Sequence, residues 1–295
     1  MANSKKASKT ALMAAIHRFL ATKEEQSEFK GQDHLATIFL PGKVKFFLSF
    51  GFIRKSVKKK MRRLVPGTYE YVTARTKFFD EQFKLSVDQD CPQIVVLGAG
   101  YDSRAMRYQS SIKNTKIFEL DEASIQKQKK KLLQKTAIDL PDVLNFVPID
   151  FNIDDIGGAL KTAGFDFSKK TMFLWEGVSM YLEEKAVSVM LKIVAEKSGP
   201  GSRIVFDYFD KTIINGNSDA YGAKEITAEV KKSSEPFRFG LDPDAVGAFL
   251  EKHKLKLKVH YSPKDLEDKY ITNEKNMLLG HVYGFGYQVV AESPG

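Results

Sequence analysis

Residues 95–104 read VVLGAGYDSR, a short apolar run that stops at two glycines and is followed by an acidic and a basic side chain. Gly98 and Gly100 let the chain turn tightly and bring backbone amides close to a ligand, because neither residue carries a Cβ atom. The loop can therefore cradle the phosphates of a dinucleotide, hold another nucleoside cofactor, or only turn the chain. The sequence around it distinguishes these possibilities.

From Pro92 onward, short apolar runs alternate with amphipathic segments, which is typical of a parallel sheet covered by helices. Asp242 is a candidate cap for a helix that starts at Pro243. The last two strands have only a loop-and-helix stretch between them, so one of them can be antiparallel. We predict an α/β fold with strands at 93–98, 115–121, 145–150, 171–176, 202–208, 255–261 and 283–292, and helices at 103–110, 123–136, 153–163, 183–198 and 243–253.

The composition excludes several classes of protein. A chain of 295 residues with 43% apolar residues can form a full hydrophobic core. Cys91 is the single cysteine, which excludes an intrachain disulfide framework and a thiolate zinc site. We therefore predict no metal site and expect an intracellular, cytoplasmic protein. The longest apolar stretch, residues 34–53, is broken by Pro41, Gly42 and lysines, so no membrane span is expected.

The chain before residue 91 has a helical pattern and no apolar run flanked like a buried strand. His17 and Arg18 cut short the apolar part of the first segment, which indicates an amphipathic helix rather than a signal peptide. We predict a helical cap over residues 1–90 and a cofactor-binding domain over residues 91–295.

Two basic runs carry much of the net charge of +9, RKSVKKKMRR at 54–63 and KQKKKLLQK at 127–135. Such runs attract acidic partners, but they are equally typical of solvated helix faces. Neither run has interleaved aromatic residues or a nucleic-acid-binding motif beside it. We therefore expect no nucleic acid as a partner.

Carboxylates stand at the ends of successive predicted strands, where an open parallel sheet binds its ligands. An acid about twenty residues after the glycines suits a ribose, because a carboxylate accepts hydrogen bonds from both vicinal hydroxyls. Glu119 and Asp121 both lie in that window. The acids in strand order are Asp102, Glu119 with Asp121, Asp150, Glu176 and Asp207.

The dinucleotide fingerprint fits this loop poorly. It requires a third glycine where the chain has Ser103, and it presents uncharged amides to the pyrophosphate rather than an acid such as Asp102. The loop therefore favours a cofactor without phosphates.

Six segments together resemble one enzyme family. They are TARTKFFDEQF (73–83), VVLGAGYDSRAMRY (95–108), FELDEASIQKQKKKLL (118–133), VPIDF (147–151), FLWEGVSMYL (173–182) and GSRIVFDY (201–208). These segments resemble the leucine carboxyl methyltransferase family of S-adenosyl-L-methionine-dependent enzymes, including its polyketide O-methyltransferase relatives. The resemblance implies a Rossmann-like, seven-stranded class I methyltransferase sheet with an N-terminal helical cap. It also implies S-adenosyl-L-methionine as cofactor and S-adenosyl-L-homocysteine as product.

The resemblance assigns roles to individual residues. Arg75 would pair with the carboxylate of the cofactor's methionine part, which suits a planar guanidinium. The other implied cofactor positions are Gly98 and Gly100 at the methionine part, Asp121 at the ribose hydroxyls, Asp150 and Phe151 at the adenine, and Glu176 near the amino group or the sulfonium. Asp102 and Glu119 are further candidates for cofactor binding.

The methyl acceptor decides whether a base is needed. A carboxylate of a small molecule or of a protein C-terminus is already ionised, whereas a hydroxyl benefits from a base. Tyr181 and Tyr208 are candidates for positioning the acceptor and Asp207 for the base, although helix packing and capping also explain such residues. Cap aromatics are candidates for an apolar acceptor pocket, with core packing as the alternative; they are Phe46, Phe47, Phe50, Phe52, Tyr69, Tyr71, Phe78 and Phe79.

Other functions stay open at this point. An NAD(P)-dependent Rossmann oxidoreductase would explain Gly98 and Gly100, but the third glycine of its fingerprint is missing. In EGVSMY (176–181), Gly177 and Ser179 imitate the nucleophile elbow of α/β-hydrolases, but Tyr181 replaces its final glycine. A non-catalytic basic module would bind RNA or a membrane surface through residues 54–63, and an inactive methyltransferase homologue would act as a scaffold.

Overall fold

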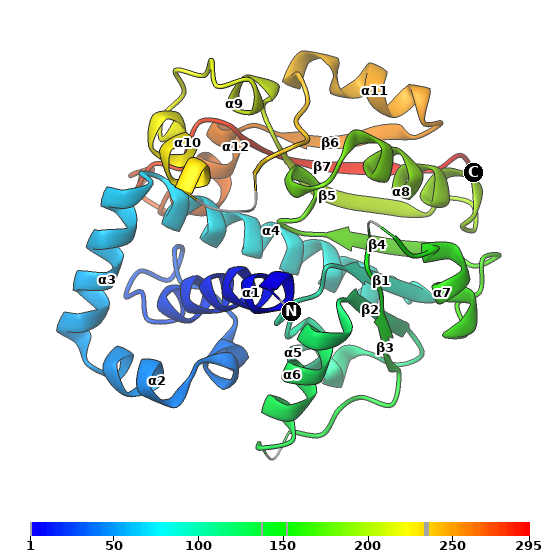
Figure 1. Cartoon of the computed structure of the whole chain (residues 1–295), viewed down its shortest axis with the longest axis horizontal. Coiled ribbons are helices and arrows are strands. Elements are labelled where there is room, and N and C mark those ends of the chain that lie inside the picture. The colour runs from blue at the N-terminus through cyan, green and yellow to red at the C-terminus, as the bar shows by residue number, and fades with distance from the viewer. Residues whose placement is uncertain (1, 137, 152, 233–235) are drawn as a thin grey trace.

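The structure is a computed structural model that describes residues 2–136, 138–151, 153–232 and 236–295. A seven-stranded sheet lies at its centre, with the strand order β3-β2-β1-β4-β5-β7-β6 (Figure 1). β1 to β5 are parallel, and β7 is antiparallel to both β5 and β6. The strands are β1 (Gln93–Leu97), β2 (Lys116–Asp121), β3 (Leu144–Pro148), β4 (Thr171–Trp175), β5 (Arg203–Phe209), β6 (Lys256–Tyr261) and β7 (Gly286–Glu292).

Helices precede the sheet and connect its strands. The longest is α4 (Thr68–Asp88), which ends shortly before β1 begins. The others are α1 (Ala2–Ala21), α2 (Gly42–Ser49), α3 (Gly51–Leu64), α5 (Arg104–Arg107), α6 (Ala123–Leu133), α7 (Ile156–Thr162), α8 (Glu184–Glu196), α9 (Lys211–Ile214), α10 (Ala223–Lys232), α11 (Val246–Lys252) and α12 (Pro263–Leu266).

The central strands are apolar on both faces because helices cover both faces. Ile94 and Val96 of β1 point into the core that includes α4, whereas Val95 and Leu97 point into the core that includes α8. This double burial explains why β1 reads as a continuous apolar run in the sequence rather than as an alternating one. All seven predicted strands are present, and the predicted antiparallel strand is β7.

Helix α4 joins the helical part of the chain to the sheet. Its side chains Phe78, Phe79 and Phe83 are fully buried in the same core as Ile94 and Val96. In Figure 1, α1 lies at the carboxyl ends of the parallel strands, and α2 and α3 form the outer edge of the cap. The division at residue 90 stays a prediction, since helices and strands share one core.

The structure departs from the predicted helices: α9, α10 and α12 match no predicted helix, and one predicted helix is shorter. The helix predicted at 103–110 is only the four-residue α5, followed by a 3-10 turn at Gln109–Ser111. Helix α10 was not predicted; Ala223 is its only fully buried residue, and Ile226 packs against the core from the same helix. Asp242 does cap the next helical segment, where its side chain accepts a hydrogen bond from the amide of Asp244. Among the described helices, none has the length and apolar character needed to cross a membrane.

Candidate active site

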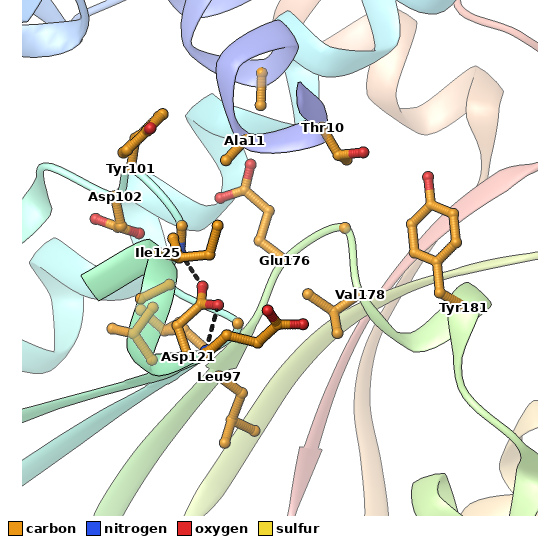
Figure 2. Close-up of a pocket in the computed structure, with 18 of the residues that line it drawn as sticks. Thr10, Ala11, Leu97, Tyr101, Asp102, Asp121, Ile125, Glu176, Val178 and Tyr181 are labelled. Atoms are coloured by element: carbon orange, nitrogen blue, oxygen red, sulfur yellow. Dashed lines mark hydrogen bonds between the residues drawn. The ribbon is translucent and has the colours of Figure 1, made fainter. Parts of the chain in front are cut away.

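The carboxyl ends of the parallel strands open into a cavity of about 540 Å³. The cavity lies where the strand order reverses between β1 and β4, the place at which open parallel sheets bind ligands. Figure 2 shows Thr10 and Ala11 of α1 on one side of it, with Asp121 and Glu176 on strand ends below them. The cavity wall thus combines the sheet with the first helix of the cap.

The loop after β1 lines the cavity and requires glycine. Gly98 has a φ angle of +65°, and a Cβ atom there would stand 2.5 Å from Cγ2 of Val178. The amides of Gly100 and Glu122 both donate hydrogen bonds to the carboxylate of Asp121, as marked in Figure 2. Burial raises the pKa of Asp121, and these two amides oppose the rise. The loop and the end of β2 are therefore locked to each other through Asp121.

Asp102 and Ser103 explain why the dinucleotide fingerprint is incomplete. Oδ1 of Asp102 accepts a hydrogen bond from the amide of Arg104 at 2.7 Å, at the start of α5. In a dinucleotide site, the first amides after the glycine loop face the pyrophosphate. The hydroxyl of Ser103 donates to Oδ1 of Asp33 at 2.6 Å and so ties the loop to the cap. A buried carboxylate at this position repels a phosphate and suits a ligand without one.

Arg104 is the centre of a buried ionic network. Its guanidinium contacts Asp80 at 2.7 Å, Asp102 at 2.6 Å and Glu176 at 2.7 Å, and only 3% of its side chain is exposed. Burial alone would raise the pKa of Asp102, but the charges of Arg104 and Lys129 and the hydrogen bond from the amide of Arg104 together outweigh burial, and the pKa falls to about 2. Arg104 and Arg75 lower the pKa of Glu176 in the same way, against the effect of burial. Both carboxylates are therefore ionised near neutral pH.

Arg75 of α4 reaches the cavity between two acids. Its Nε lies 3.2 Å from Oε1 of Glu176, and its Nη1 lies 3.1 Å from Oδ2 of Asp207. Asp207 also accepts a hydrogen bond from the amide of Gly177 at 2.6 Å and one from the hydroxyl of Tyr71 at 3.3 Å. Burial raises the pKa of Asp207, and Arg75 opposes the rise. Asp207 therefore holds both Arg75 and the loop after β4.

Gly177 offers a test of this packing. Its φ angle is +69°, and a Cβ atom there would stand 2.8 Å from Nη1 of Arg75. We expect Gly177→Ala to lower the free energy of unfolding by about 1–3 kcal/mol in a urea titration, through backbone strain and displacement of Arg75. Gly216→Ala is the control, because φ is +72° there and nothing lies within 4 Å of the added Cβ. An equal loss in both variants would show that Arg75 tolerates the change.

Most of the sequence-predicted residues meet at this cavity. Tyr181 lines it in a 3-10 turn after β4 (Ser179–Tyr181) and is labelled in Figure 2 across from Glu176. Asp207 does not line it and lies behind Arg75 instead. The predicted residues in the cavity wall are Arg75, Gly98, Gly100, Asp102, Asp121, Asp150, Phe151, Glu176 and Tyr181.

Glu119 and Tyr208 lie elsewhere. Glu119 is buried below the cavity, where its Oε2 atom accepts from Nζ of Lys129 at 2.6 Å. The hydroxyl of Tyr208 is 2.9 Å from Nε2 of His260 in the core on the opposite side of the sheet. The geometry therefore supports neither a ribose contact for Glu119 nor an acceptor contact for Tyr208.

The predicted apolar acceptor pocket of cap aromatics is not part of this cavity. Tyr69, Tyr71, Phe78 and Phe79 are fully buried core residues, as the alternative prediction held. The other four, Phe46, Phe47, Phe50 and Phe52, are exposed on the outer edge of the cap.

Several cavity residues had no role assigned from the sequence. Arg104 was visible in the glycine motif, but its partners Asp80 and Glu176 are 24 and 72 residues away along the chain. Arg18 donates to the carbonyl oxygen of Tyr101 at 2.7 Å and contacts Asp33 at 2.7 Å, which ties α1 to the loop. The sequence gives no signal for such long-range contacts.

A family model described as leucine carboxyl methyltransferase matches residues 11–195, which is well over half of the chain. A Bacillus subtilis protein with the provisional name S-adenosyl-L-methionine-dependent methyltransferase YktD is 28% identical over 205 residues, which are 70% of this chain and 67% of that protein. Provisionally named S-adenosyl-L-methionine-dependent methyltransferases of Mycobacteroides abscessus and Mycobacterium tuberculosis are 32% and 34% identical. These two matches cover 49% and 50% of this chain and 45% and 47% of the relatives, so the chain spans about half the length of the mycobacterial proteins.

Two solved structures have similar folds. A provisionally named methyltransferase of Thermobifida fusca has a TM-score of 0.59 and 14% identity, over 83% of this chain and 90% of that one. A DUF574 family protein of Streptomyces avermitilis has a TM-score of 0.59 and 12% identity, over 96% and 97% of the two chains. At such identities the likeness concerns the fold alone, and it confirms the predicted α/β fold of class I methyltransferases.

Proposed function

Because the chain belongs to the leucine carboxyl methyltransferase family, we propose that it transfers a methyl group from S-adenosyl-L-methionine to an oxygen atom of an acceptor. The acceptor is a carboxylate or hydroxyl of a small molecule, or the C-terminal carboxylate of a protein. The observation that carries this proposal is the buried Asp102 at the start of α5, which favours a nucleoside cofactor without phosphates at the glycine loop.

The residues of the cavity wall fit this cofactor. Asp121 stands at the end of β2, about twenty residues after the glycines, where a carboxylate suits the two ribose hydroxyls. Asp150 and Phe151 follow β3 and would flank the adenine. Arg75 would bind the carboxylate of the methionine part, and Glu176 beside it would bind the amino group. Once bound, the cofactor supplies an electrophilic methyl group on a cationic sulfur.

The chain's own contribution to catalysis would then be placement. Tyr181 lies in the cavity wall and would orient the acceptor oxygen in line with the methyl group. Helix α1 covers the cavity with Thr10 and Ala11 and would exclude water. A carboxylate acceptor needs no base. Asp207 is behind Arg75, so we assign it the positioning of Arg75 and Gly177 rather than a proton transfer.

A cofactor titration tests this proposal. We expect calorimetry to detect binding of S-adenosyl-L-homocysteine but not of NADH. Asp121→Ala should weaken that binding by about 10- to 100-fold, equivalent to about 1–3 kcal/mol, because a charged hydrogen-bond partner is lost. Asp88→Ala, at the exposed end of α4, is the matched control and should bind as the wild type does. Binding of NADH alone, or unchanged affinity in Asp121→Ala, would contradict the proposal.

The acceptor class needs a separate measurement. We would supply methyl-labelled cofactor with carboxylic acids, phenols and a peptide that ends in a free leucine carboxylate. A methyl ester releases volatile methanol in mild base, whereas a methyl ether does not. Label released by base would assign a carboxylate acceptor, and label that resists base would assign a hydroxyl. Label found only on nitrogen would overturn the proposed transfer to oxygen.

A further inference from the structure

Helices α2 and α3 are joined at Phe50 and lie at an angle to each other (Figure 1); this helix pair, residues 42–64, which we call the α2–α3 hairpin, carries four exposed phenylalanines around its turn. Phe46, Phe47, Phe50 and Phe52 are 62%, 54%, 40% and 72% exposed. Their rings pack on one another, with centroids 5.7 Å apart for Phe46 and Phe47 and 5.4 Å apart for Phe46 and Phe50. They therefore make one compact apolar knob. Such a cluster on a protein surface marks an interaction site.

The rest of the hairpin explains why the knob stays outside the core. Ile53, Val57 and Met61 lie four residues apart along α3 and pack against the core. Phe52 lies off this inner row, on the outer side of the helix with Lys55. Ile53, Val57 and Met61 occupy the side of α3 that faces the core, and the four phenylalanines remain exposed to solvent. Figure 1 shows α2 and α3 at its edge.

All charged side chains of α2 and α3 themselves are cationic. The sequence contains no aspartate or glutamate between Asp33 and Glu70. Lys58 and Arg62 pair with Glu24 and Glu70 of neighbouring segments. The remaining cations of the hairpin are exposed along α2 and α3; they are Lys43, Lys45, Lys55, Lys59, Lys60 and Arg63. The occupant of this surface must therefore be apolar at its centre and anionic around it.

Two other occupants fit this surface less well. A second copy of the chain, docked through the same face, would bring the like-charged rims of both copies together. Nucleic acid uses aromatic rings spaced along a basic groove, so that bases stack on their faces. Here the rings pack edge to face against each other on a convex turn. An anionic lipid bilayer, in contrast, has phosphates at its surface and an apolar interior beneath them. The cations of the hairpin match the phosphates, and the phenylalanine rings match the apolar interior.

We propose that the α2–α3 hairpin docks the protein on the surface of an anionic membrane. The four phenylalanines enter the boundary between headgroups and acyl chains, and the lysines and Arg63 bind the lipid phosphates. The hairpin does not span the bilayer. This assignment is independent of the proposed methyl transfer, because no hairpin residue lines the cavity wall among the described residues.

Vesicle co-sedimentation tests the assignment. We expect the wild-type protein to sediment with vesicles of phosphatidylcholine and phosphatidylglycerol, and to be released by salt. Lys59→Glu/Lys60→Glu and Phe46→Ser/Phe52→Ser should each weaken binding by at least about tenfold. Lys127→Glu/Lys131→Glu is the matched control, since it makes the same charge change at exposed positions of the basic run on α6. All variants should unfold at the wild-type temperature, because the altered side chains are exposed.

Fluorescence gives a second readout. Trp175 is the only tryptophan of the chain and is buried, so its emission should not respond to lipid. Phe52→Trp should add an emission that shifts to shorter wavelength with anionic vesicles and is quenched by brominated lipids. The assignment is wrong if the wild type ignores anionic vesicles, if the α6 control loses as much binding, or if the phenylalanine variant binds normally. A stable wild-type dimer that this variant dissociates would instead assign the surface to a second copy.

Discussion

Arg104→Met is expected to lower the free energy of unfolding by about 3–5 kcal/mol at pH 7, because it leaves buried carboxylates without their shared cation. Asp80, Asp102 and Glu176 contact this guanidinium within 2.7 Å and are themselves nearly buried. Arg107 still contacts Asp80 at 2.7 Å and Arg75 still contacts Glu176 at 3.2 Å, so the loss should fall mainly on Asp102. A urea titration at pH 7 measures the effect.

Two further variants make this result specific. Arg104→Lys keeps the charge but cannot reach three carboxylates with one planar group, so its stability should lie between those of the wild type and Arg104→Met. Arg63→Met, at an exposed position of α3, should change the stability by no more than about 0.5 kcal/mol. If Arg104→Met came within about 1 kcal/mol of the wild type, the network would not hold the site together.

The pH dependence of the Arg104 variant has a defined sign. The pKa of Asp102 is about 2 in the folded protein, below its ordinary value of 3.8. Its ionised form therefore contributes stability above pH 3.8, and this contribution is lost as the pH falls toward 2. Arg104→Met removes the contribution, so the two proteins should differ most above that range and converge in acid.

The sheet could be predicted from the sequence because its strands are buried on both faces. QIVVLG and TMFLWE read as apolar runs between glycines and polar segments, and the structure contains β1 and β4 at these places. The positions of the strand-end acids followed from the same pattern. The sequence could not show which face of the sheet each side chain occupies. A strand that is buried on both faces has no alternation of polar and apolar residues that would distinguish its two faces.

Asp207 and Tyr208 illustrate this limit. They are consecutive residues of β5 and therefore point to opposite faces of the sheet. Asp207 meets Arg75 on the cap side, whereas Tyr208 meets His260 on the other side. The sequence offered both as candidates for one site, and only the pairing of β5 with its neighbours and the packing of α4 separate them.

Glu119 and Asp121 show a second limit, which concerns depth. Both point to the same face of β2, because they are two residues apart. Glu119 pairs in register with Val96 inside β1, while Asp121 follows the last paired residue of that ladder, Leu120, and so reaches the cavity. The register of two strands is set by the fold, so the spacing of about twenty residues after the glycines could not choose between them.

Lys129→Met is expected to make the stability strongly dependent on pH, through Glu119. This lysine lies 2.6 Å from Oε2 of Glu119, and each side chain is only 1% exposed. Oε1 of Glu119 has no hydrogen-bond partner among the described residues. Burial raises the pKa of Glu119 from 4.5 to about 7 even though Lys129 opposes the rise. Without Lys129, the pKa of Glu119 should rise further, because the ionised form loses its counterion.

The direction of this pH dependence is set by the proton on the Glu119 carboxyl, which the folded protein binds more tightly than the unfolded chain does. The contribution of the protonated Glu119 is complete below its ordinary pKa of 4.5 and is lost as the pH rises through the folded value. We therefore expect Lys129→Met to cost about 1 kcal/mol or less at pH 5 and about 3–5 kcal/mol at pH 8 in urea titrations. Lys127→Met, at an exposed position of the same helix, should cost little at either pH. Adding Glu119→Gln to Lys129→Met should abolish the added pH dependence, whereas an equal loss at both pH values would show that Glu119 is not the responsible group.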